Sequence, residues 1–376
     1  MKILIAGGGT GGHLVPAMTV ARTWLETHAG AEVLLVGAKR PLDRKLLGAS
    51  GLPHRLIPAG GLKGKTFSER LRSAVLLLGG VAASFWILFR FRPRVVLGVG
   101  GYASAPAVLA AWCTGRPVVL MEQNAHPGAA NRFLSRFAKA AALGFPEARD
   151  LLGRTHCVVT GVPLRPEIEA LAAETRSEGG GEREADPASG SPPTLLVFGG
   201  SQGSHALNEA LCRALPAWKA RGLSVSVIHV TGEADAESVR RAHREAGFDA
   251  EVSPFLENMA AAYRKADLAI ARAGAVTVSE LMAAGVPAIL VPMPAGADHH
   301  QAANAAAAGG AALTIPQEEL EARLDGEAAA LLADPARLRA MSAAGRAKAM
   351  PGAAARIARL CGSIANRGEP DDRDPH

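Results

Sequence analysis

Aromatic residues are scarce in this 376-residue chain, at 4% of the total, and no run of lysine and arginine is interleaved with them. Proteins that read nucleic acid combine basic grooves with aromatic side chains, so the composition argues against a nucleic-acid partner. Cysteine is scarce as well, and the thiols are too scattered for a zinc motif or a disulfide framework. We expect reduced core residues at Cys113, Cys157, Cys212 and Cys361.

The amino terminus lacks a basic segment followed by an apolar leader, because the chain enters an apolar strand at Lys2. No export signal is visible there, and we expect the protein to be located in the cytosol. The net charge is +6 and the pI is near 9.4, a mild excess that favours anionic partners such as phosphates or a membrane surface. The length and the 48% hydrophobic share predict about two domains.

Short apolar runs alternate with helix-length segments along the chain. They are rich in valine and leucine without polar alternation, which is typical of parallel strands buried on both faces. The runs lie at 2–6, 32–37, 94–101, 117–123 and 156–161, and again at 194–200, 224–232, 267–274, 286–294 and 311–316. The pattern predicts an α/β chain of two doubly wound parallel-sheet domains. The polar segment 174–193 and the tail from Ser363 are predicted to be disordered.

Five glycines stand within six positions at 7–12, directly after the first predicted strand. Gly7, Gly9 and Gly12 satisfy the dinucleotide-binding fingerprint, in which a glycine loop and a helix amino terminus approach a pyrophosphate. The acid that holds a ribose after the second strand is missing. Lys39 and Arg40 stand there instead, so an NADP-dependent oxidoreductase remains an alternative.

A similar glycine-rich loop after a predicted strand recurs in GVGGYAS at 98–104 and in GGSQGS at 199–204. Each loop lets backbone amides and a helix amino terminus approach an oxygen-rich group, although a tight strand-to-helix turn explains a single loop equally well. Two sheets that carry such loops indicate a site for two different ligands. A nucleoside-triphosphate loop is excluded at GGLKGKT, because its first glycine would fall at Ala59.

The stretch ARAGAVTVSELMAAGVPAILVP predicts a further anion-binding helix start. A strand ends at Ala271, and Thr277 or Ser279 can begin a helix that ends at Gly285. Its amides would face a pyrophosphate. Glu280 would lie in the first turn, where it either accepts both hydroxyls of a ribose or only complements the helix dipole.

Eight motifs follow one another across nearly the whole chain: GGTGGH, GLKGK, GVGGYAS, EQN, GVPLR, GGSQGS, RAGAVTVSE and DHHQAANA. In this order they resemble the MurG family of peptidoglycan glycosyltransferases, which move N-acetylglucosamine (GlcNAc) from UDP-GlcNAc to undecaprenyl-pyrophosphoryl-MurNAc-pentapeptide. The resemblance implies a GT-B fold of two Rossmann-like domains. It places an acceptor and membrane-side domain at 1–165, a hinge and disordered linker at 166–193, a UDP-GlcNAc-binding domain at 194–350, a helix at about 351–362 that packs back on the first domain, and a disordered tail at 363–376.

The resemblance also implies residue roles. Donor contacts would come from Thr10, Gly11, Gly12, Asn124, Arg165, Ser201, Leu256, Ala275, Val276, Thr277, Val278, Ser279, Glu280 and Gln301. Among these, Glu280 would hold the ribose hydroxyls and Leu256 would bind uracil through its backbone. The sequence departs from the family pattern at Met121, Val162 and Ala273, where histidine, asparagine and serine are usual, so no histidine at 121 takes part in catalysis.

The expected reaction is an inverting single displacement, in which the 4-hydroxyl of MurNAc attacks the anomeric carbon of GlcNAc as UDP leaves. No Asp-x-Asp clamp stands where a sugar nucleotide would need one. We therefore expect helix amino termini, loop amides and Arg165 to stabilise the diphosphate without a metal or another cofactor. His13 is the first candidate for the base, since a helix amino terminus keeps imidazole neutral. It would otherwise only shape the glycine loop, and Glu122 is the alternative base.

Residues 70–94 combine an apolar segment with flanking arginines. The uncharged part falls short of the roughly 20 residues that span a bilayer, so we do not expect it to cross one. With the resemblance above, we expect this stretch to form a surface helix at the cytoplasmic face of the inner membrane. About half of its apolar residues would instead be buried between the sheet and the surface. Docking on anionic lipid would use Leu76, Leu77, Phe85, Trp86 and Phe89. The lipid-linked acceptor would be received by Lys63, Lys65, Tyr102 and Ser104.

Three functions stay in view. The ordered motifs favour the glycosyltransferase, the glycines at 7–12 with two basic residues allow the oxidoreductase, and the 70–94 stretch alone would suit a non-catalytic membrane scaffold. The sequence leaves open the stem-peptide variant, the oligomeric state and membership of a cell-wall synthesis complex.

Overall fold

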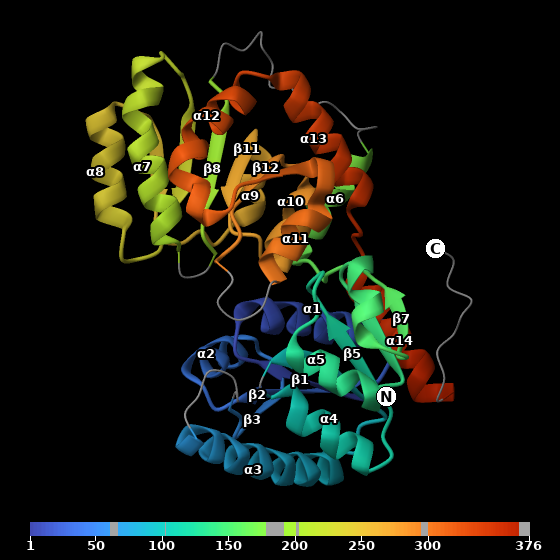
Figure 1. Cartoon of the computed structure of the whole chain (residues 1–376). Coiled ribbons are helices and arrows are strands. Elements are labelled where there is room, and N and C mark those ends of the chain that lie inside the picture. Colours follow the sequence, from blue (N-terminus) through green and yellow to red (C-terminus); the bar gives the residue numbers. More distant parts are fainter. Residues whose placement is uncertain (61–66, 102, 178–191, 201–202, 295–299, 368–376) are drawn as a thin grey trace. The chain divides into compact units, whose positions relative to one another are not determined.

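The computed structural model describes residues 1–60, 67–101, 103–177, 192–200, 203–294 and 300–367. The chain divides into two compact units, one formed by Met1–Arg165 and the segment that begins at Gly352, the other by Pro166–Pro351. Figure 1 shows that helices flank the strands in each unit. The units are described separately below as unit 1 and unit 2.

Unit 1 is built on a parallel sheet with the strand order β3-β2-β1-β4-β5-β6-β7. Its strands are β1 (Lys2–Gly8), β2 (Glu32–Ala38), β3 (His54–Ile57), β4 (Val95–Gly101), β5 (Val118–Glu122), β6 (Ala140–Leu143) and β7 (His156–Val159). The order reverses between β1 and β4, which is where open parallel sheets hold their ligands. The sequence did not reveal β3, a half-exposed edge strand, or β6, whose alanines have little strand preference.

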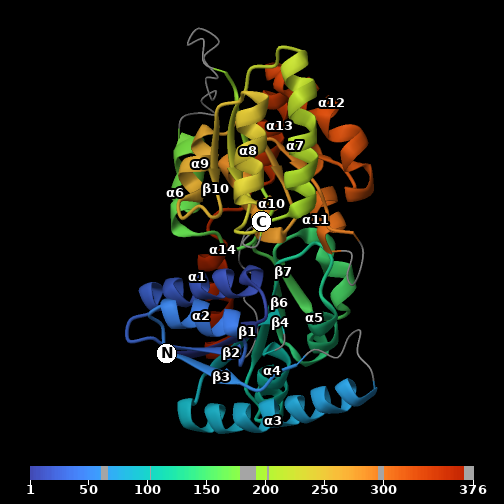
Figure 2. The ribbon, with the colours of Figure 1, turned by 90° about the vertical axis from the view of Figure 1, so that its left-hand side faces the viewer.

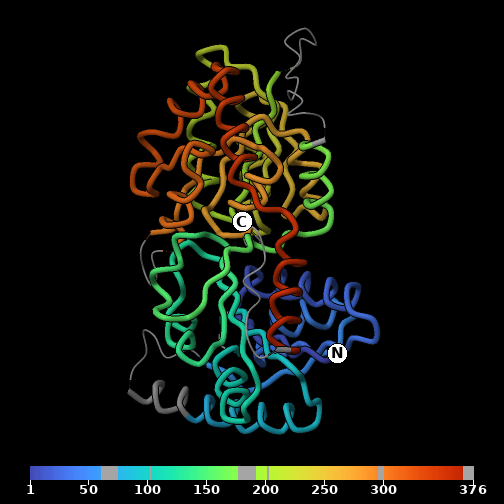
Figure 3. The backbone as a smooth tube through the Cα atoms, turned by 90° about the vertical axis from the view of Figure 1, so that its right-hand side faces the viewer, coloured from blue at the N-terminus to red at the C-terminus, as the bar shows by residue number. Residues whose placement is uncertain are grey.

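Helices cover both faces of this sheet. α1 (Gly11–Thr27) and α14 (Ala353–Arg367) bury their apolar sides on one face, and α3 (Phe67–Phe91) and α4 (Ser104–Cys113) cover the other. Figure 2 shows α1 and α3 on opposite sides of the strands, and Figure 3 shows the red α14 beside the blue amino-terminal part. The shorter elements are α2 (Pro41–Ala49), α5 (Ala129–Leu134), η1 (Ser135–Phe137) and η2 (Pro146–Leu152).

Unit 2 repeats the design with the strand order β10-β9-β8-β11-β12-β13, again parallel. The strands are β8 (Thr194–Phe198), β9 (Ser226–Val230), β10 (Ala250–Ser253), β11 (Leu268–Ala271), β12 (Ala288–Leu290) and β13 (Ala312–Thr314). The two sheets confirm the predicted α/β fold class. Only β10 escaped the sequence analysis, because none of its residues is fully buried and its pattern is polar.

The helices of unit 2 are α6 (Pro166–Ser177), α7 (His205–Ala220), α8 (Ala236–Ala246), α9 (Met259–Lys265), α10 (Ala275–Ala284), α11 (His300–Ala308), α12 (Leu320–Leu332) and α13 (Pro335–Lys348), with η3 (Gly309–Ala311) and η4 (Gln317–Glu319). Trp218 on α7 is fully buried in a core that α7 and α12 form over the sheet. Burying side chains of this size supplies much of the free energy that holds helices on a sheet.

Two expected disordered segments are partly helical. Residues 166–177, assigned to a hinge, form α6 in unit 2, because Ile168, Leu171 and Ala172 lie on one helical side and are buried. The carboxyl-terminal helix continues to Arg367 rather than ending at 362, since Ile364 is 1% exposed and packs in the core of unit 1. Residues 178–191 and 368–376 lie outside the described part of the chain.

Residues 70–91 of the stretch 70–94 belong to α3, which agrees with the predicted surface helix. Phe85, Trp86 and Phe89 are 38%, 63% and 73% exposed. Leu76 and Leu77, which were expected in the exposed patch, are half-buried. Val75 and Leu78 are exposed in their place, because they lie on the same side of the helix as Phe85, Trp86 and Phe89 at a spacing of three and four residues. Among the described residues, no helix has the length and hydropathy to cross a bilayer.

Candidate functional site

The glycines after β1 serve two different purposes. A Cβ at Gly7 would lie 2.1 Å from the Val99 side chain, and one at Gly8 would lie 2.1 Å from Asp43 Oδ2. These two glycines are therefore required by packing within unit 1. Around Gly11 nothing lies within 4 Å of such a Cβ, and around Gly12 only Thr10 Oγ1 does, at 3.8 Å. The amino end of α1 is thus open to a ligand, as anion-binding helix starts require.

Asp43 in the first turn of α2 holds this loop, a role that the sequence analysis missed. Its buried carboxylate accepts hydrogen bonds from Gly9 N at 2.9 Å and from Ala38 N at 2.8 Å. The Gly9 amide is consequently occupied by the protein itself and does not serve a dinucleotide pyrophosphate. The sequence did contain a signal, an acidic residue shortly after the second strand. It was passed over because the dinucleotide-binding fingerprint expects the acid at the end of that strand.

Asp43→Ala should lower the free energy of unfolding by about 2–5 kcal/mol, because the buried amide of Ala38 and the partly buried amide of Gly9 lose their acceptor. Urea denaturation followed by circular dichroism measures the change. Arg44→Ala, an exposed neighbour on the same helix, is the matched control and should stay within about 0.5 kcal/mol of the parent. A denaturation midpoint unchanged by Asp43→Ala would contradict this role.

His13 lies in the first turn of α1 and is half-buried. Its Nδ1 is 2.7 Å from Thr10 Oγ1. The opposite edge of the ring faces Gly100 at the end of β4, where a Cβ would approach His13 Nε2 to 3.0 Å. The amino end of α1 and the end of β4 therefore meet at this ring, at the point where the strand order reverses.

Glu122 is unsuited to the alternative role of base. The carboxylate is 2% exposed and lies at the end of β5. Oε1 accepts from the backbone and side-chain nitrogens of Asn124, both at 3.0 Å, and Oε2 accepts from Gly128 N at 3.1 Å and Asn131 Nδ2 at 2.9 Å. Because both oxygens are engaged by four donors, this carboxylate orients Asn124 rather than taking a proton.

The expected acceptor residues are only partly visible. Lys63, Lys65 and Tyr102 lie outside the described residues. Ser104 begins α4 and is fully buried, and its hydroxyl has no hydrogen-bond partner in the described part of the chain. Its side chain consequently does not face an incoming acceptor, which corrects the expectation for this residue.

In unit 2 the helix after β11 begins earlier than predicted. α10 begins at Ala275, after Gly274 as the N-cap, rather than at Thr277 or Ser279. Glu280 accordingly lies in the second turn and not in the first. The helix begins earlier because a glycine can serve as an N-cap where serine or threonine was expected. The order of strand, turn and helix is as predicted.

Along α10, Ala275, Val278, Ser279 and Glu280 are buried, and Val276 and Thr277 are half-buried. The Glu280 carboxylate is 4% exposed and accepts a hydrogen bond from the buried hydroxyl of Tyr263 at 3.0 Å. Tyr263 thus fixes the orientation of this acid beside the amino end of α10.

Arg272, at the end of β11, ties the neighbouring loops together. It donates from Nε to Ser204 Oγ at 3.0 Å and from Nη2 to Gln317 Oε1 at 2.6 Å. Its Nη1 donates to two carbonyls after β12. Burial lowers the pKa of this guanidinium. The sequence analysis used Arg272 only as a family landmark and did not identify this bracing role.

The other expected donor residues are spread over both units. Leu256 follows β10 and is half-buried, and Gln301 lies in the first turn of α11 with its Oε1 accepting from Met293 N at 3.0 Å. Arg165, half-buried, ends the continuous part of unit 1. Ser201 lies outside the described residues. Among those described, no three His, Cys, Asp or Glu side chains gather as a metal site.

Comparison with protein families matches both parts of the chain. The glycosyltransferase family 28 N-terminal domain matches residues 3–143, and the glycosyltransferase family 28 C-terminal domain matches residues 194–357. Together with two doubly wound parallel sheets, these matches define a glycosyltransferase of the GT-B fold class.

Curated relatives match nearly the full length. A protein of Anaeromyxobacter sp. (strain Fw109-5) is 41% identical over 98% of this chain and 94% of its own length, and one of Alkalilimnicola ehrlichii is 43% identical over 96% and 98%. Both are named UDP-N-acetylglucosamine--N-acetylmuramyl-(pentapeptide) pyrophosphoryl-undecaprenol N-acetylglucosamine transferase. The chain belongs to this family, the MurG glycosyltransferases, and is a hexosyltransferase.

Solved structures agree. The crystal structure of Acinetobacter baumannii MurG is 30% identical and has a TM-score of 0.77, covering 96% of this chain and 99% of its own. A UDP-GlcNAc 2-epimerase from Neisseria meningitidis, at 15% identity, with a TM-score of 0.64 over 96% and 99% of the two chains, shares the fold alone. None of these relatives supports the oxidoreductase alternative.

Proposed function

We propose that this chain transfers GlcNAc from UDP-GlcNAc to the 4-hydroxyl of MurNAc in undecaprenyl-pyrophosphoryl-MurNAc-pentapeptide, giving the disaccharide lipid intermediate of peptidoglycan synthesis. The observation that carries the proposal is near full-length identity of about 40% to relatives named for this reaction. The names of the same relatives support UDP-GlcNAc as the donor substrate and the lipid-linked MurNAc-pentapeptide as the acceptor substrate.

Unit 2 is the proposed donor domain. The helix α10 begins after the N-cap Gly274, and the amides of its first turn would face the diphosphate, where the helix dipole favours negative charge. Glu280, oriented by Tyr263, accepts hydrogen bonds from the ribose hydroxyls, and Leu256 presents its backbone to uracil. Thr277 and Gln301 complete the contacts to the diphosphate and the sugar.

Unit 1 is the proposed acceptor domain, and it supplies the base. Thr10, Gly11 and Gly12 offer the open amino end of α1 to the sugar and diphosphate. Asn124 and Arg165 would add contacts to the same groups. Amides and guanidinium would stabilise the charge that develops on the leaving UDP. The MurNAc hydroxyl attacks from the opposite face, so the α-linked donor gives a β-glycoside.

His13 takes the proton of the attacking hydroxyl. If its Nδ1–H donates to Thr10 Oγ1 across 2.7 Å, Nε2 carries the lone pair at the loop junction next to Gly100. Two features support a neutral ring: the amino end of α1 disfavours imidazolium, and α1 has no acid in its first turn. The orientation of the ring therefore matches general-base catalysis.

The exposed side of α3 is the proposed membrane-docking surface, at the cytoplasmic face of the membrane. Trp86 and Phe89 stand out from the helix, and the Arg92 guanidinium lies 5.8 Å from the centre of the Phe89 ring. Apolar side chains beside arginines suit a headgroup layer that contains anionic lipid. Docking there would keep the acceptor's undecaprenyl tail in the bilayer.

The test is UDP release from UDP-GlcNAc and a MurNAc-pentapeptide pyrophosphoryl lipid, with UDP-GalNAc and acceptor-free controls. Turnover should require the acceptor and prefer UDP-GlcNAc. Glu280→Gln should raise KM for UDP-GlcNAc about 10–100-fold, because a charge-assisted hydrogen bond to ribose is worth roughly 1.5–3 kcal/mol. Glu245→Gln, an equal charge change at an exposed site on α8, should leave KM unchanged. Absence of both turnover and UDP-GlcNAc binding would refute the proposal.

A further inference from the structure

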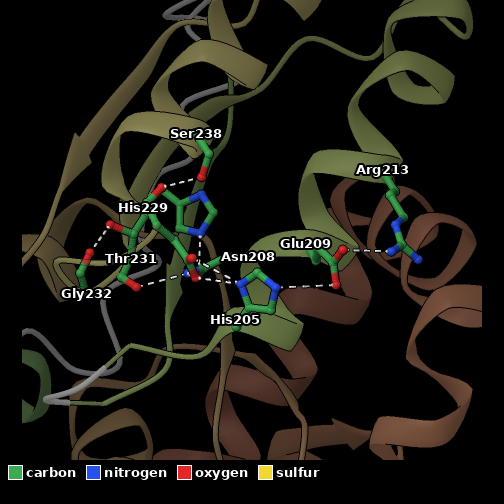
Figure 4. A network of polar contacts seen from close by, with 9 residues as sticks. His205, Asn208, Glu209, Arg213, His229, Thr231, Gly232 and Ser238 are labelled. Atoms are coloured by element: carbon green, nitrogen blue, oxygen red, sulfur yellow. Dashed lines mark hydrogen bonds and ion pairs between the residues drawn. The ribbon is translucent and has the colours of Figure 1, made fainter.

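A buried chain of polar side chains lies beneath the amino end of α7. Asn208, 2% exposed, donates from Nδ2 to Thr231 O at 2.9 Å and to Asp235 Oδ2 at 2.8 Å. Its Oδ1 is 3.0 Å from His229 Nε2, and His229 Nδ1 is 3.2 Å from His243 Nε2. Figure 4 shows Asn208 between the rings of His229 and His205.

If each ring carries one hydrogen, only one arrangement of protons satisfies this series of hydrogen bonds. The Asn208 amide gives both its hydrogens away, so its oxygen must accept from His229 Nε2–H. His229 Nδ1 then carries a lone pair and accepts from His243 Nε2–H. His243 Nδ1 is left as a bare acceptor, which agrees with its lack of a partner among the described residues. Each ring then holds its one hydrogen on Nε2.

The surroundings keep both rings uncharged. Burial lowers the pKa of His229 to about 3, helped by neighbouring His243, and burial lowers the pKa of His243 to about 4. Desolvation would raise the pKa of Asp235, but hydrogen bonds from Asn208 and His205 outweigh it and hold that pKa below its ordinary value. The direction of hydrogen bonding is thus constant at neutral pH.

The Asn208 amide supports the glycine loop that follows β8. A Cβ at Gly203 would lie only 2.0 Å from Thr231 O, so the loop backbone rests directly on the carbonyl that Asn208 holds. Asp235, the other acceptor of Asn208, is 3.0 Å from Nδ1 of His205, the first residue of α7. Two contacts of one amide consequently position the loop and the helix start.

We propose that Asn208 is a positioning residue for the donor diphosphate, which aligns Gly203 and the amino end of α7 and is itself oriented by His229 and His243. This inference rests on the proposed function and on the expectation from the sequence that the glycine loop after β8 approaches the donor diphosphate. The three side chains act through the loop, with no contact to the donor. The uridine part of the donor is assigned to Glu280 and Leu256, and its binding does not depend on Asn208, His229 or His243.

The experiment compares binding of UDP and of uridine by calorimetry, since only UDP carries the phosphates. Asn208→Asp keeps the shape of the side chain but removes both donated hydrogens. We expect Kd for UDP to rise about tenfold or more, as for a lost hydrogen-bond network, with Kd for uridine within about twofold. Arg213→Ala, an exposed residue on α7, is the control and should change neither constant.

A second pair of variants serves if Asn208→Asp does not fold. His243→Leu removes the donor to His229 and should weaken UDP selectively, whereas His243→Gln retains an N–H donor and should restore binding. Equal losses for UDP and uridine, or no loss in either, would overturn the positioning role. A parent protein that fails to bind UDP at all would instead refute the proposed function, so the two failures are distinguishable.

Discussion

His13→Ala should lower kcat for GlcNAc transfer about 10²–10⁴-fold, the usual contribution of a positioned general base. The donor is proposed to be held mainly by unit 2, so Kd for UDP should change little. The reason is the location of the ring, whose Nδ1 is bound to Thr10 and whose Nε2 faces the junction with the β4 loop. Steady-state kinetics at saturating donor and acceptor measure the loss.

The pH profile separates a base from a residue that only shapes the loop. The parent should lose kcat/KM as the pH falls through the pKa of its base, and His13→Ala should have lost that acid limb. Thr10→Val removes the partner of Nδ1 and should reduce kcat less than His13→Ala does, while Thr10→Ser should restore it. A kcat for His13→Ala within a few-fold of the parent would assign the base elsewhere.

Acidification from pH 7 to pH 5 should destabilise unit 2 by roughly 4 kcal/mol through His229 and His243. Their pKa values are lowered to about 3 and about 4 in the folded protein, against 6.5 when unfolded. Below pH 6.5 the unfolded chain therefore binds protons that the folded chain does not. Each histidine lowers the free energy of unfolding by about 1.4 kcal/mol per pH unit until the folded pKa is reached.

Urea denaturation at a series of pH values measures this slope. His243→Gln removes one titrating group and should roughly halve the loss between pH 7 and pH 5. Asp235 also has a shifted pKa, but it is lowered from 3.8, so its stabilisation is lost only at more acidic pH, outside this range. A pH-independent stability of the parent between pH 7 and pH 5 would show that the two rings are not buried as neutral groups.

The sequence predicted the fold class because buried parallel strands carry a local signal. After a charged first residue, the runs at 2–6, 32–37 and 94–101 are apolar, and each contributed a strand covered on both faces. The elements that were missed lack that signal: β3 and β10 are half-exposed, and β6 consists mostly of alanine. Segments of mixed polarity such as 166–177 form helices only because a neighbouring surface buries one side.

The sequence by itself also determined the family and the candidate residues, since ordered motifs are a property of the chain. It could not decide which glycine serves packing and which a ligand, because that depends on distances from Gly7 to Val99 and from Gly8 to Asp43. It could not separate His13 from Glu122, whose four hydrogen-bond donors come from a later turn and helix. The Asn208 chain joins α7, β9 and α8, and only tertiary packing brings such distant side chains into one buried network, where desolvation decides their charge.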